Sequence, residues 1–118
     1  MNKKEYITSV KETKVDFQRI MEVMEKYDLG LDDTFVRAIS KADTIDFFGE
    51  ERRALSYNEI LDASSLLGVD ATEKGIIPVI DSYDGTYIVY LLSEKKWARF
   101  STVDKIVYRK RDTLEEVL

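Results

Sequence analysis

The chain has no cysteine and no histidine, and only one proline and five scattered glycines among its 118 residues. Without cysteine there are no disulfides, thiolate metal sites or cysteine nucleophiles. Without histidine there is no Ser-His-Asp triad and no imidazole acid–base catalysis. A glycine-rich phosphate-binding loop is also missing. We therefore expect no catalytic residues, no cofactor and no metal site. An enzyme that uses only carboxylates, tyrosine or lysine remains open.

Long hydrophobic runs are lacking as well. No apolar stretch approaches the roughly 20 residues of a membrane helix. The beginning, MNKKEYITSVKE, has lysines but no apolar core of the kind a signal peptide needs. The missing cysteines are compatible with a reducing compartment. These features predict a cytoplasmic protein that makes no contact with a membrane.

What is present fits one globular domain. Hydrophobic residues make up 44% of the chain and charged residues 35%, enough for a single core and a solvated surface. No repeat, low-complexity tract or linker divides the sequence, so we expect residues 1–118 to form one domain.

The net charge of −5 is unevenly distributed. Residues 1–92 carry 11 basic and 18 acidic side chains, whereas residues 93–111 carry seven basic and two acidic ones, a local charge of +5. The last seven residues are acidic again, with a charge of −3. An acidic body disfavours general binding to nucleic acid and favours a basic partner.

The first part of the chain has helical patterns. Ser9 and Glu12 have the spacing of a capping box, which predicts a short helix. A second helix follows, with or without a break, and Gly30 suits its C-terminus because glycine tolerates a positive φ. Its spacing of three and four predicts a buried face made of Phe17, Ile20, Met21, Met24 and Tyr27.

Two further helices are expected before residue 70. Asp32 or Asp33 caps the first of them, whose predicted buried residues are Phe35, Val36 and Ile39. The second begins with a capping box at Ser56 and Glu59 and ends at Gly68. Its predicted inward residues are Tyr57, Ile60, Leu61 and Leu66.

From Gly75 the pattern changes to that of strands. Ile76–Ile80 and Tyr87–Leu92 are rich in β-branched and aromatic residues. The second of these is apolar on both faces, so helices should cover the sheet on both sides. KWARFS and KIVYRK read as two more strands, and DTLEEVL as a short closing helix with Asp112 and Glu115 at capping-box spacing. The order predicts an α+β fold: a twisted, mainly antiparallel sheet of about four to six strands packed with helices.

The segment DSYDG, between the first two strands, raises the question of a site. Its aspartates and glycine are the residues of a hairpin turn. The spacing does not fit a calcium loop, because the glycine is fifth from Asp81 rather than sixth and Leu92 takes the place of the bidentate glutamate. A partner contact by Asp81, Tyr83 and Asp84 is the remaining functional interpretation.

Two features of the basic stretch also have a structural and a functional reading. Trp97, in EKKWARF, either packs on the sheet or stacks on a partner or a nucleobase. Arg109–Arg111 form either a solvated strand end or a phosphate-binding run. The adjacent acidic pairs lie in helices and loops, where neighbouring side chains diverge by about 100° and do not converge on a substrate.

Four segments together resemble the SUKH superfamily, which contains the fungal Smi/Knr cell-wall regulators and many bacterial immunity proteins. They are LGLDDTF, RALSYNEIL, GIIPVIDSYDGTYIVYLL and DTLEEVL. The resemblance covers about residues 15–118 and rests on the order and spacing of the segments. It implies an α+β domain without enzymatic activity.

The resemblance also implies a function: a protein-binding module that neutralises a cognate bacterial toxin, often a nuclease, by direct binding. On this hypothesis the partner is a basic toxin domain, and the expected contacts are Asp81, Tyr83, Asp84 and Trp97. The alternatives are a regulatory or scaffold protein of the same fold with an endogenous protein partner, and a weak nucleic-acid binder that uses residues 95–111.

Overall fold

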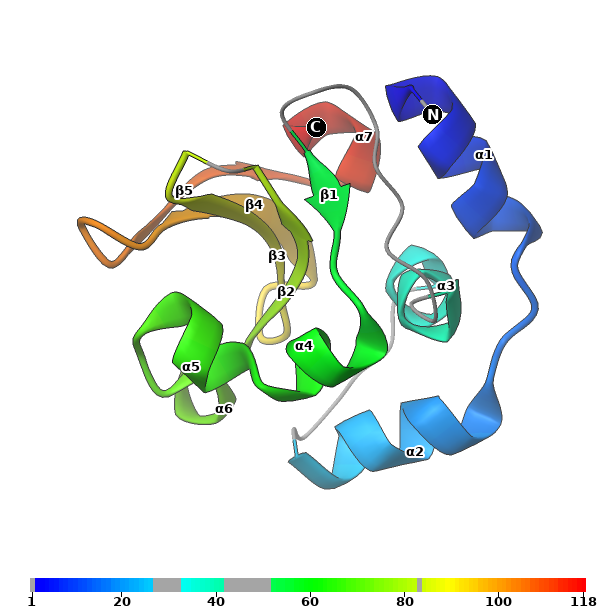
Figure 1. Cartoon of the computed structure of the whole chain (residues 1–118), viewed down its shortest axis with the longest axis horizontal. Helices are drawn as coiled ribbons and strands as arrows, with labels where there is room; N and C mark the ends of the chain where they lie inside the picture. Colours follow the sequence, from blue (N-terminus) through cyan, green and yellow to red (C-terminus); the bar gives the residue numbers. More distant parts are fainter. Residues whose placement is uncertain (1, 27–32, 42–51, 83) are drawn as a thin grey trace.

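The computed structural model describes residues 2–26, 33–41, 52–82 and 84–118. Three helices come first, followed by a two-residue strand, three short helices, four longer strands and a closing helix (Figure 1). The helices are α1 Lys3–Glu12, α2 Phe17–Lys26, α3 Asp33–Lys41, α4 Tyr57–Leu61, α5 Ala63–Leu67, α6 Ala71–Lys74 and α7 Leu114–Val117. The strands are β1 Arg53–Ala54, β2 Ile76–Asp81, β3 Thr86–Leu91, β4 Lys96–Ser101 and β5 Ile106–Arg111.

The five strands form one antiparallel sheet in the order β1-β2-β3-β4-β5, so each strand pairs with its neighbour in sequence. The predicted α+β fold with an antiparallel sheet is confirmed. The single proline, Pro78, stands where the register between β2 and β3 shifts. A proline lacks the N–H that the ladder needs, and a bulge is one of the few places in a sheet that accepts it.

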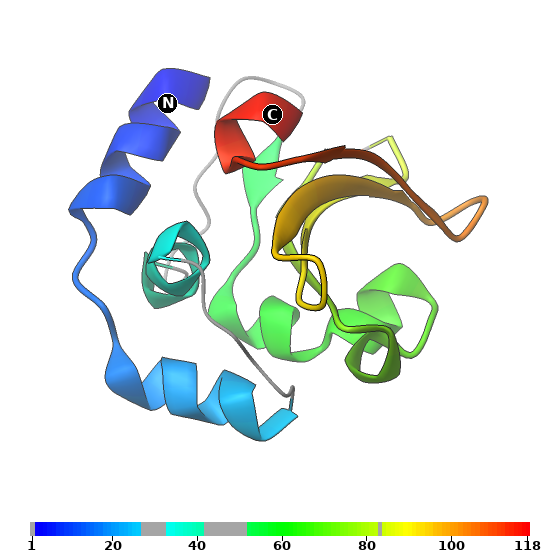
Figure 2. The ribbon, with the colours of Figure 1, turned by 180° about the vertical axis from the view of Figure 1, so that it is seen from behind.

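Both faces of the sheet are covered, as the apolar character of β3 predicts. On one face, α1, α3 and α7 enclose the larger core cluster, which includes Val10, Phe35, Ile39, Tyr90 and Trp97. On the other, α5 and α6 enclose a smaller cluster. Figures 1 and 2 show these helices on opposite sides of the curved sheet, while α2 runs along the periphery beyond α3.

Trp97 lies at the centre of the larger cluster. Its side chain is 1% exposed, its ring is 5.1 Å from that of Tyr90, and Phe35 meets it edge-on at 6.5 Å. The reading in which Trp97 packs on the sheet is therefore confirmed, and the ring is not presented at the surface.

Three capping boxes were predicted from the sequence, and the structure contains one of them. Ser56 and Glu59 form the predicted reciprocal capping box at α4. The predicted box at Ser9 and Glu12 is wrong, because α1 begins seven residues earlier, capped by Asn2. The Ser9 hydroxyl instead donates to the carbonyl of Tyr6 one turn back.

The closing helix also starts elsewhere than predicted. The N-cap of α7 is Thr113, whose hydroxyl donates to the carboxylate of Glu116. Asp112 instead accepts a hydrogen bond from Lys96 Nζ at 2.6 Å. The box predicted for Asp112 and Glu115 is therefore wrong by one residue, since a lysine on the neighbouring strand takes the Asp112 carboxylate.

The limits of the remaining helices agree only in part with the predictions. A break at Thr13–Asp16 separates α1 from α2, and Gly68 ends α5 with a φ of 70°. The helix expected from Ser56 to Gly68 is divided at Asp62 into α4 and α5. Predictions for Tyr27, Gly30, Asp32 and the side chains of Met24 and Val36 lie outside the described residues. None of the described helices has the length and apolar character to cross a membrane.

Candidate protein-binding surface

The orientation of α2 is fixed by the residue just before the helix, Asp16. Asp16 accepts a hydrogen bond from the backbone N–H of Arg19 at 3.2 Å, which is the side-chain cap of a helix N-terminus. The backbone N–H of Asp16 in turn donates to the hydroxyl of Ser40 at 2.7 Å. The start of α2 is thereby tied to the last turn of α3.

Arg19 ties the next turn of α2 to the same place. Its Nη1 donates to the carbonyl oxygens of Ser40 at 3.2 Å and Ile39 at 3.5 Å, at the C-terminal end of α3. A cation is favourable there because the last carbonyls of a helix lack intrahelical partners. The Arg19 guanidinium also lies 4.5 Å from the centre of the Tyr57 ring, a cation–π contact with α4.

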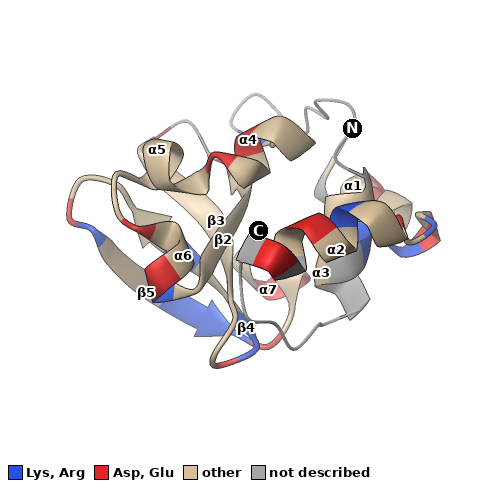
Figure 3. Cartoon of the chain, turned by 90° about the horizontal axis from the view of Figure 1, so that it is seen from below, with Lys and Arg blue, Asp and Glu red and all other residues tan. Residues whose placement is uncertain are grey.

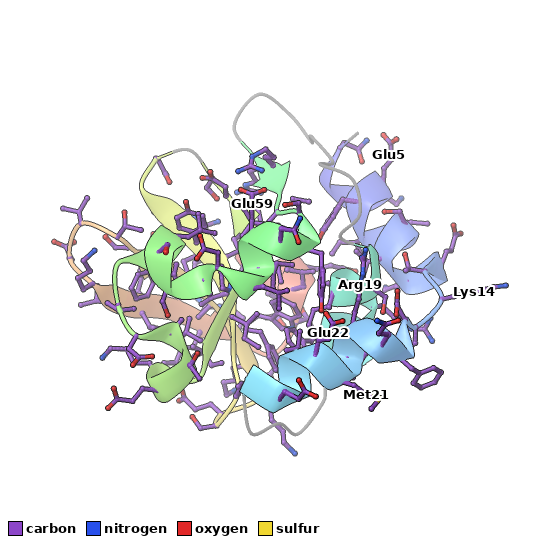
Figure 4. The ribbon with its side chains drawn as sticks, turned by 60° about the horizontal axis from the view of Figure 1, so that its bottom comes forward. Glu5, Lys14, Arg19, Met21, Glu22 and Glu59 are labelled. Atoms are coloured by element: carbon purple, nitrogen blue, oxygen red, sulfur yellow. The ribbon has the colours of Figure 1, made fainter. Side chains whose placement is uncertain are left out.

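A third contact joins α2 to α4. The Tyr57 hydroxyl donates to the Glu22 carboxylate at 2.5 Å. Burial, and then this acceptor, raise the pKa of Tyr57 well above its usual value. The phenol is therefore a hydrogen-bond donor throughout the physiological range. Figure 4 shows Arg19 and Glu22 on the side of α2 that faces the rest of the molecule.

These contacts turn an apolar surface outward. With Arg19 inward, the buried residues of α2 are Ile20 and Val23, 5% and 1% exposed. Phe17 and Met21 are 75% and 65% exposed. They are one turn apart, so they lie side by side on the outer face. Figure 4 shows Met21 directed away from the molecule.

Phe17 and Met21 were predicted to lie in the core, and that prediction is wrong. The prediction holds for Ile20, which is buried, but the other buried residue is Val23 and not Phe17 or Met21, so the helix is rotated toward Val23 relative to the predicted face. The signal that could have identified the correct face was Arg19, a side chain able to reach carbonyls at the end of another helix. Such long-range contacts are not visible in a periodic pattern.

Exposed polar residues border the apolar pair. Gln18 and Glu25 are exposed and Glu22 is half-buried. Glu22 faces α4, so we call the surface made of Phe17, Gln18, Met21 and Glu25 the outer face of α2. Its one acidic side chain is that of Glu25.

The DSYDG segment is a turn, as its chemistry predicts. The backbone N–H of Ser82 donates to the carbonyl of Thr86, and Asp84 accepts from the N–H of Thr86 at 3.0 Å. Gly85 has a φ of 81°, where a side chain would be strained. Of the expected contact residues here, Asp84 is exposed and Tyr83 lies outside the described part of the chain.

Asp81 instead takes part in an intramolecular cluster of charged side chains with Arg53 and Glu59. Its carboxylate lies 3.6 Å from Arg53, which also binds Glu59 through two hydrogen bonds of 2.7 and 2.9 Å. The Arg53 hydrogen bonds, and then those of Ser56, hold the pKa of Glu59 at about 2. This arrangement joins β1 and β2 to α4. The structure does not bring Asp81, Asp84 and Trp97 together into one surface.

The basic stretch of residues 93–111 is only partly available. Lys96 pairs with Asp112 and Lys110 with Glu94, while Arg99 donates to the carbonyl of Val117. With Trp97 buried, Tyr108 is the aromatic that stays exposed among the basic side chains of this stretch. A single exposed ring is a smaller stacking platform than the series of aromatics used to bind single-stranded nucleic acid. Within the described residues, no group of three or more acidic side chains is placed to hold a metal ion.

No protein-family model matches this chain, and no curated protein or solved structure matches it.

Proposed function

We propose that the chain is a non-enzymatic, cytoplasmic protein-binding module that neutralises a basic toxin domain, of nuclease type, by direct binding. The observation that carries this proposal is the pair Phe17 and Met21, held outward on α2 at 75% and 65% exposure while the central strand β3 is covered on both faces. Adjacent large apolar side chains on a rigid helix are typical of a protein interface, where they act as anchors.

The charge around this pair favours a basic partner. Glu25 borders it, Arg19 is turned inward toward carbonyl oxygens, and the whole chain carries −5. Nuclease domains are basic where they bind phosphate, so an acidic binder gains speed of association from electrostatic steering. The resemblance to SUKH proteins, whose bacterial members are typically immunity proteins, supports the same proposal.

The rigidity of α2 also supports binding. Its tethers come from Asp16, Arg19 and Glu22 and reach two other helices. A pre-ordered surface loses little conformational entropy when a partner binds, which leaves more of the contact energy as affinity.

A comparative pull-down tests this proposal. Tagged protein is incubated with lysate of the native cell, washed at low and at high salt, and the retained proteins are identified by mass spectrometry. The same experiment is done with the double variant Phe17→Ser/Met21→Ser and with a control, Thr72→Ala, which changes an exposed side chain on α6 that belongs to neither α2 nor β5. We expect one basic protein to be retained at stoichiometric amounts by the wild type and the control and to be lost with the α2 variant.

Two results would contradict the proposal. If the α2 variant retained the partner at wild-type levels, the outer face of α2 would be excluded as the binding surface. Retention of an endogenous, non-toxin protein would favour the alternative of a regulatory or scaffold protein of the same fold.

A further inference from the structure

The last strand of the sheet presents a second surface that the proposed function does not use. β5 pairs only with β4 within the described residues, so it is an edge of the sheet. Alternate residues of such a strand direct backbone N–H and C=O groups away from the sheet, where another strand can pair with them.

Exposed apolar side chains gather beside this edge. Val103, at the tip of the β4–β5 hairpin, is 81% exposed, and Ile106 and Tyr108 on β5 are 52% and 38% exposed. By contrast, every residue of β3 except Tyr87 is buried. β5 is therefore a strand with apolar side chains that the domain itself does not cover.

The far end of β5 is strongly basic. Arg109, Lys110 and Arg111 are all exposed, and Figure 3 shows the end of β5 in the colour of lysine and arginine. Lys110 pairs with Glu94 at 2.9 Å. No carboxylate pairs with Arg109 or Arg111 within the described part of the chain. The edge therefore carries two positive charges that no ion pair there offsets.

A bulge separates the two halves of this surface. The register between β4 and β5 shifts between Trp97 and Arg99 on β4, opposite an extra residue on β5. Arg109 has a φ of 55°, the left-handed conformation of a bulged strand. The bulge limits a regular ladder to the part of β5 before Arg109, and cations at an edge disfavour pairing with an identical strand. A second copy would also bring two such basic runs into one interface, where like charges repel.

We propose that the β5 edge, defined by Val103, Ile106, Tyr108, Arg109 and Arg111, binds an extended acidic segment of a protein by strand addition. The segment's backbone would continue the sheet, its aliphatic side chains would contact Ile106 and Val103, and its carboxylates would pair with Arg109 and Arg111. A nucleic acid fits less well, because Glu94, Asp104 and Asp112 lie in the same stretch and the one tryptophan is buried.

Fluorescence anisotropy with synthetic peptides tests this inference on the full chain at low salt. The probe is a labelled peptide of alternating glutamate and valine, and the comparison peptides replace glutamate by lysine or place a proline at the centre. We expect the acidic peptide to bind at least tenfold more tightly than either comparison peptide, and NMR amide shifts on binding to centre on residues 103–111.

Protein variants separate the contributions. Arg109→Glu/Arg111→Glu should weaken binding of the acidic peptide more than tenfold, and Val103→Ser/Ile106→Ser about fivefold, while Phe17→Ser/Met21→Ser leaves it unchanged. Circular dichroism confirms that each variant folds, and the single change Ile106→Ser serves if a double variant does not. The α2 variant also keeps this test independent of the proposed function, since either surface can fail alone.

Three outcomes would overturn the inference. They are no binding of the acidic peptide at about 1 mM, equal binding of the proline-containing peptide, and tighter binding of a labelled oligonucleotide that is abolished by the same charge reversal. The second would mean attraction by charge without strand addition, and the third a nucleic-acid surface.

Discussion

The guanidinium of Arg19 lies over the ring of Tyr57, 4.5 Å from its centre, and thereby joins α2 to α4. The same side chain donates to two carbonyls at the end of α3. One residue thus fixes the rotation of α2 against two other helices. Because the rotation decides which side chains face solvent, it also decides that Phe17 and Met21 form the candidate binding surface.

Loss of this contact should loosen α2. Arg19→Ala removes the hydrogen bonds to Ile39 and Ser40 and the cation–π contact, so we expect a loss of about 2 kcal/mol in the free energy of unfolding. Chemical denaturation measures it, and hydrogen exchange should show faster exchange within α2. Lys14→Ala, which removes an exposed cation just before the helix, is the control and should change stability by less than about 0.5 kcal/mol. Equal effects of the two changes would contradict the anchoring role.

Because of the rotation of α2, two apolar residues one turn apart should contribute very differently to stability. Phe17→Ala removes an exposed ring and should cost less than about 0.5 kcal/mol. Ile20→Ala empties a buried position and should cost about 2–4 kcal/mol. Thermal or urea unfolding of the two variants is sufficient. A larger loss from Phe17→Ala than from Ile20→Ala would contradict this rotation, because it would mean that Phe17 is packed in the core and Ile20 is not.

The protein should become less stable in acid because Glu59 loses its charge. Its pKa in the folded protein is about 2, against about 4.3 for a free side chain. A carboxyl whose pKa is lowered by folding stabilises the protein above the unfolded value, and this contribution is lost as the pH falls from about 4.5 toward 2.

The matching variant is Glu59→Gln, which keeps a capping side chain and loses the ion pair with Arg53. We expect it to be about 1–2 kcal/mol less stable than the wild type at pH 7, and the difference to shrink as the pH approaches 2. Glu73→Gln, at the equivalent position of α6 behind the Asp70 cap, is the control and should change the stability at pH 7 by less than about 0.5 kcal/mol. A difference from the wild type that stays constant between pH 7 and 2 would contradict the role of the Glu59 charge.

The turn between β3 and β4 contains a strained lysine. Lys95 has a φ of 55°, a conformation that costs a residue with a side chain about 1–2 kcal/mol. Lys95→Gly relieves this strain but adds about 0.5–1 kcal/mol of backbone entropy to lose on folding, so we expect a net gain of about 0.5–1 kcal/mol. Ser93→Gly in the same turn, where φ is not positive, should destabilise the protein. Calorimetry on both variants checks the sign, and a destabilised Lys95→Gly would rule out strain at this residue.

Much of the fold could be predicted from local chemistry. The two apolar runs around DSYDG predicted β2, β3 and their turn, and Ser56, Glu59 and Gly68 predicted the limits of α4 and α5. These features depend on contacts between residues close in sequence, which periodicity and capping rules describe well. The double-sided burial of β3 followed from the absence of polar residues on either face.

The candidate surface could not be predicted in the same way. Asp81 and Asp84 looked equivalent in sequence, but Asp81 is taken by Arg53, which is distant in the chain and adjacent in the sheet. Phe17 and Ile20 were both assigned to the core, and only the contacts of Arg19 with α3 and α4 separate them. In each case a long-range partner of an arginine decides which side chain remains exposed, and single-sequence patterns do not contain that information.

The most direct test of the central claim is the affinity of the purified partner for the wild type and for Phe17→Ser/Met21→Ser, measured by isothermal titration calorimetry. Removal of two anchors should cost at least about 2 kcal/mol, or roughly a 30-fold rise in Kd. The control, Thr72→Ala on α6, should bind with wild-type affinity. An unchanged Kd for the double variant, with its fold intact by circular dichroism, would contradict the assignment of α2 as the binding surface.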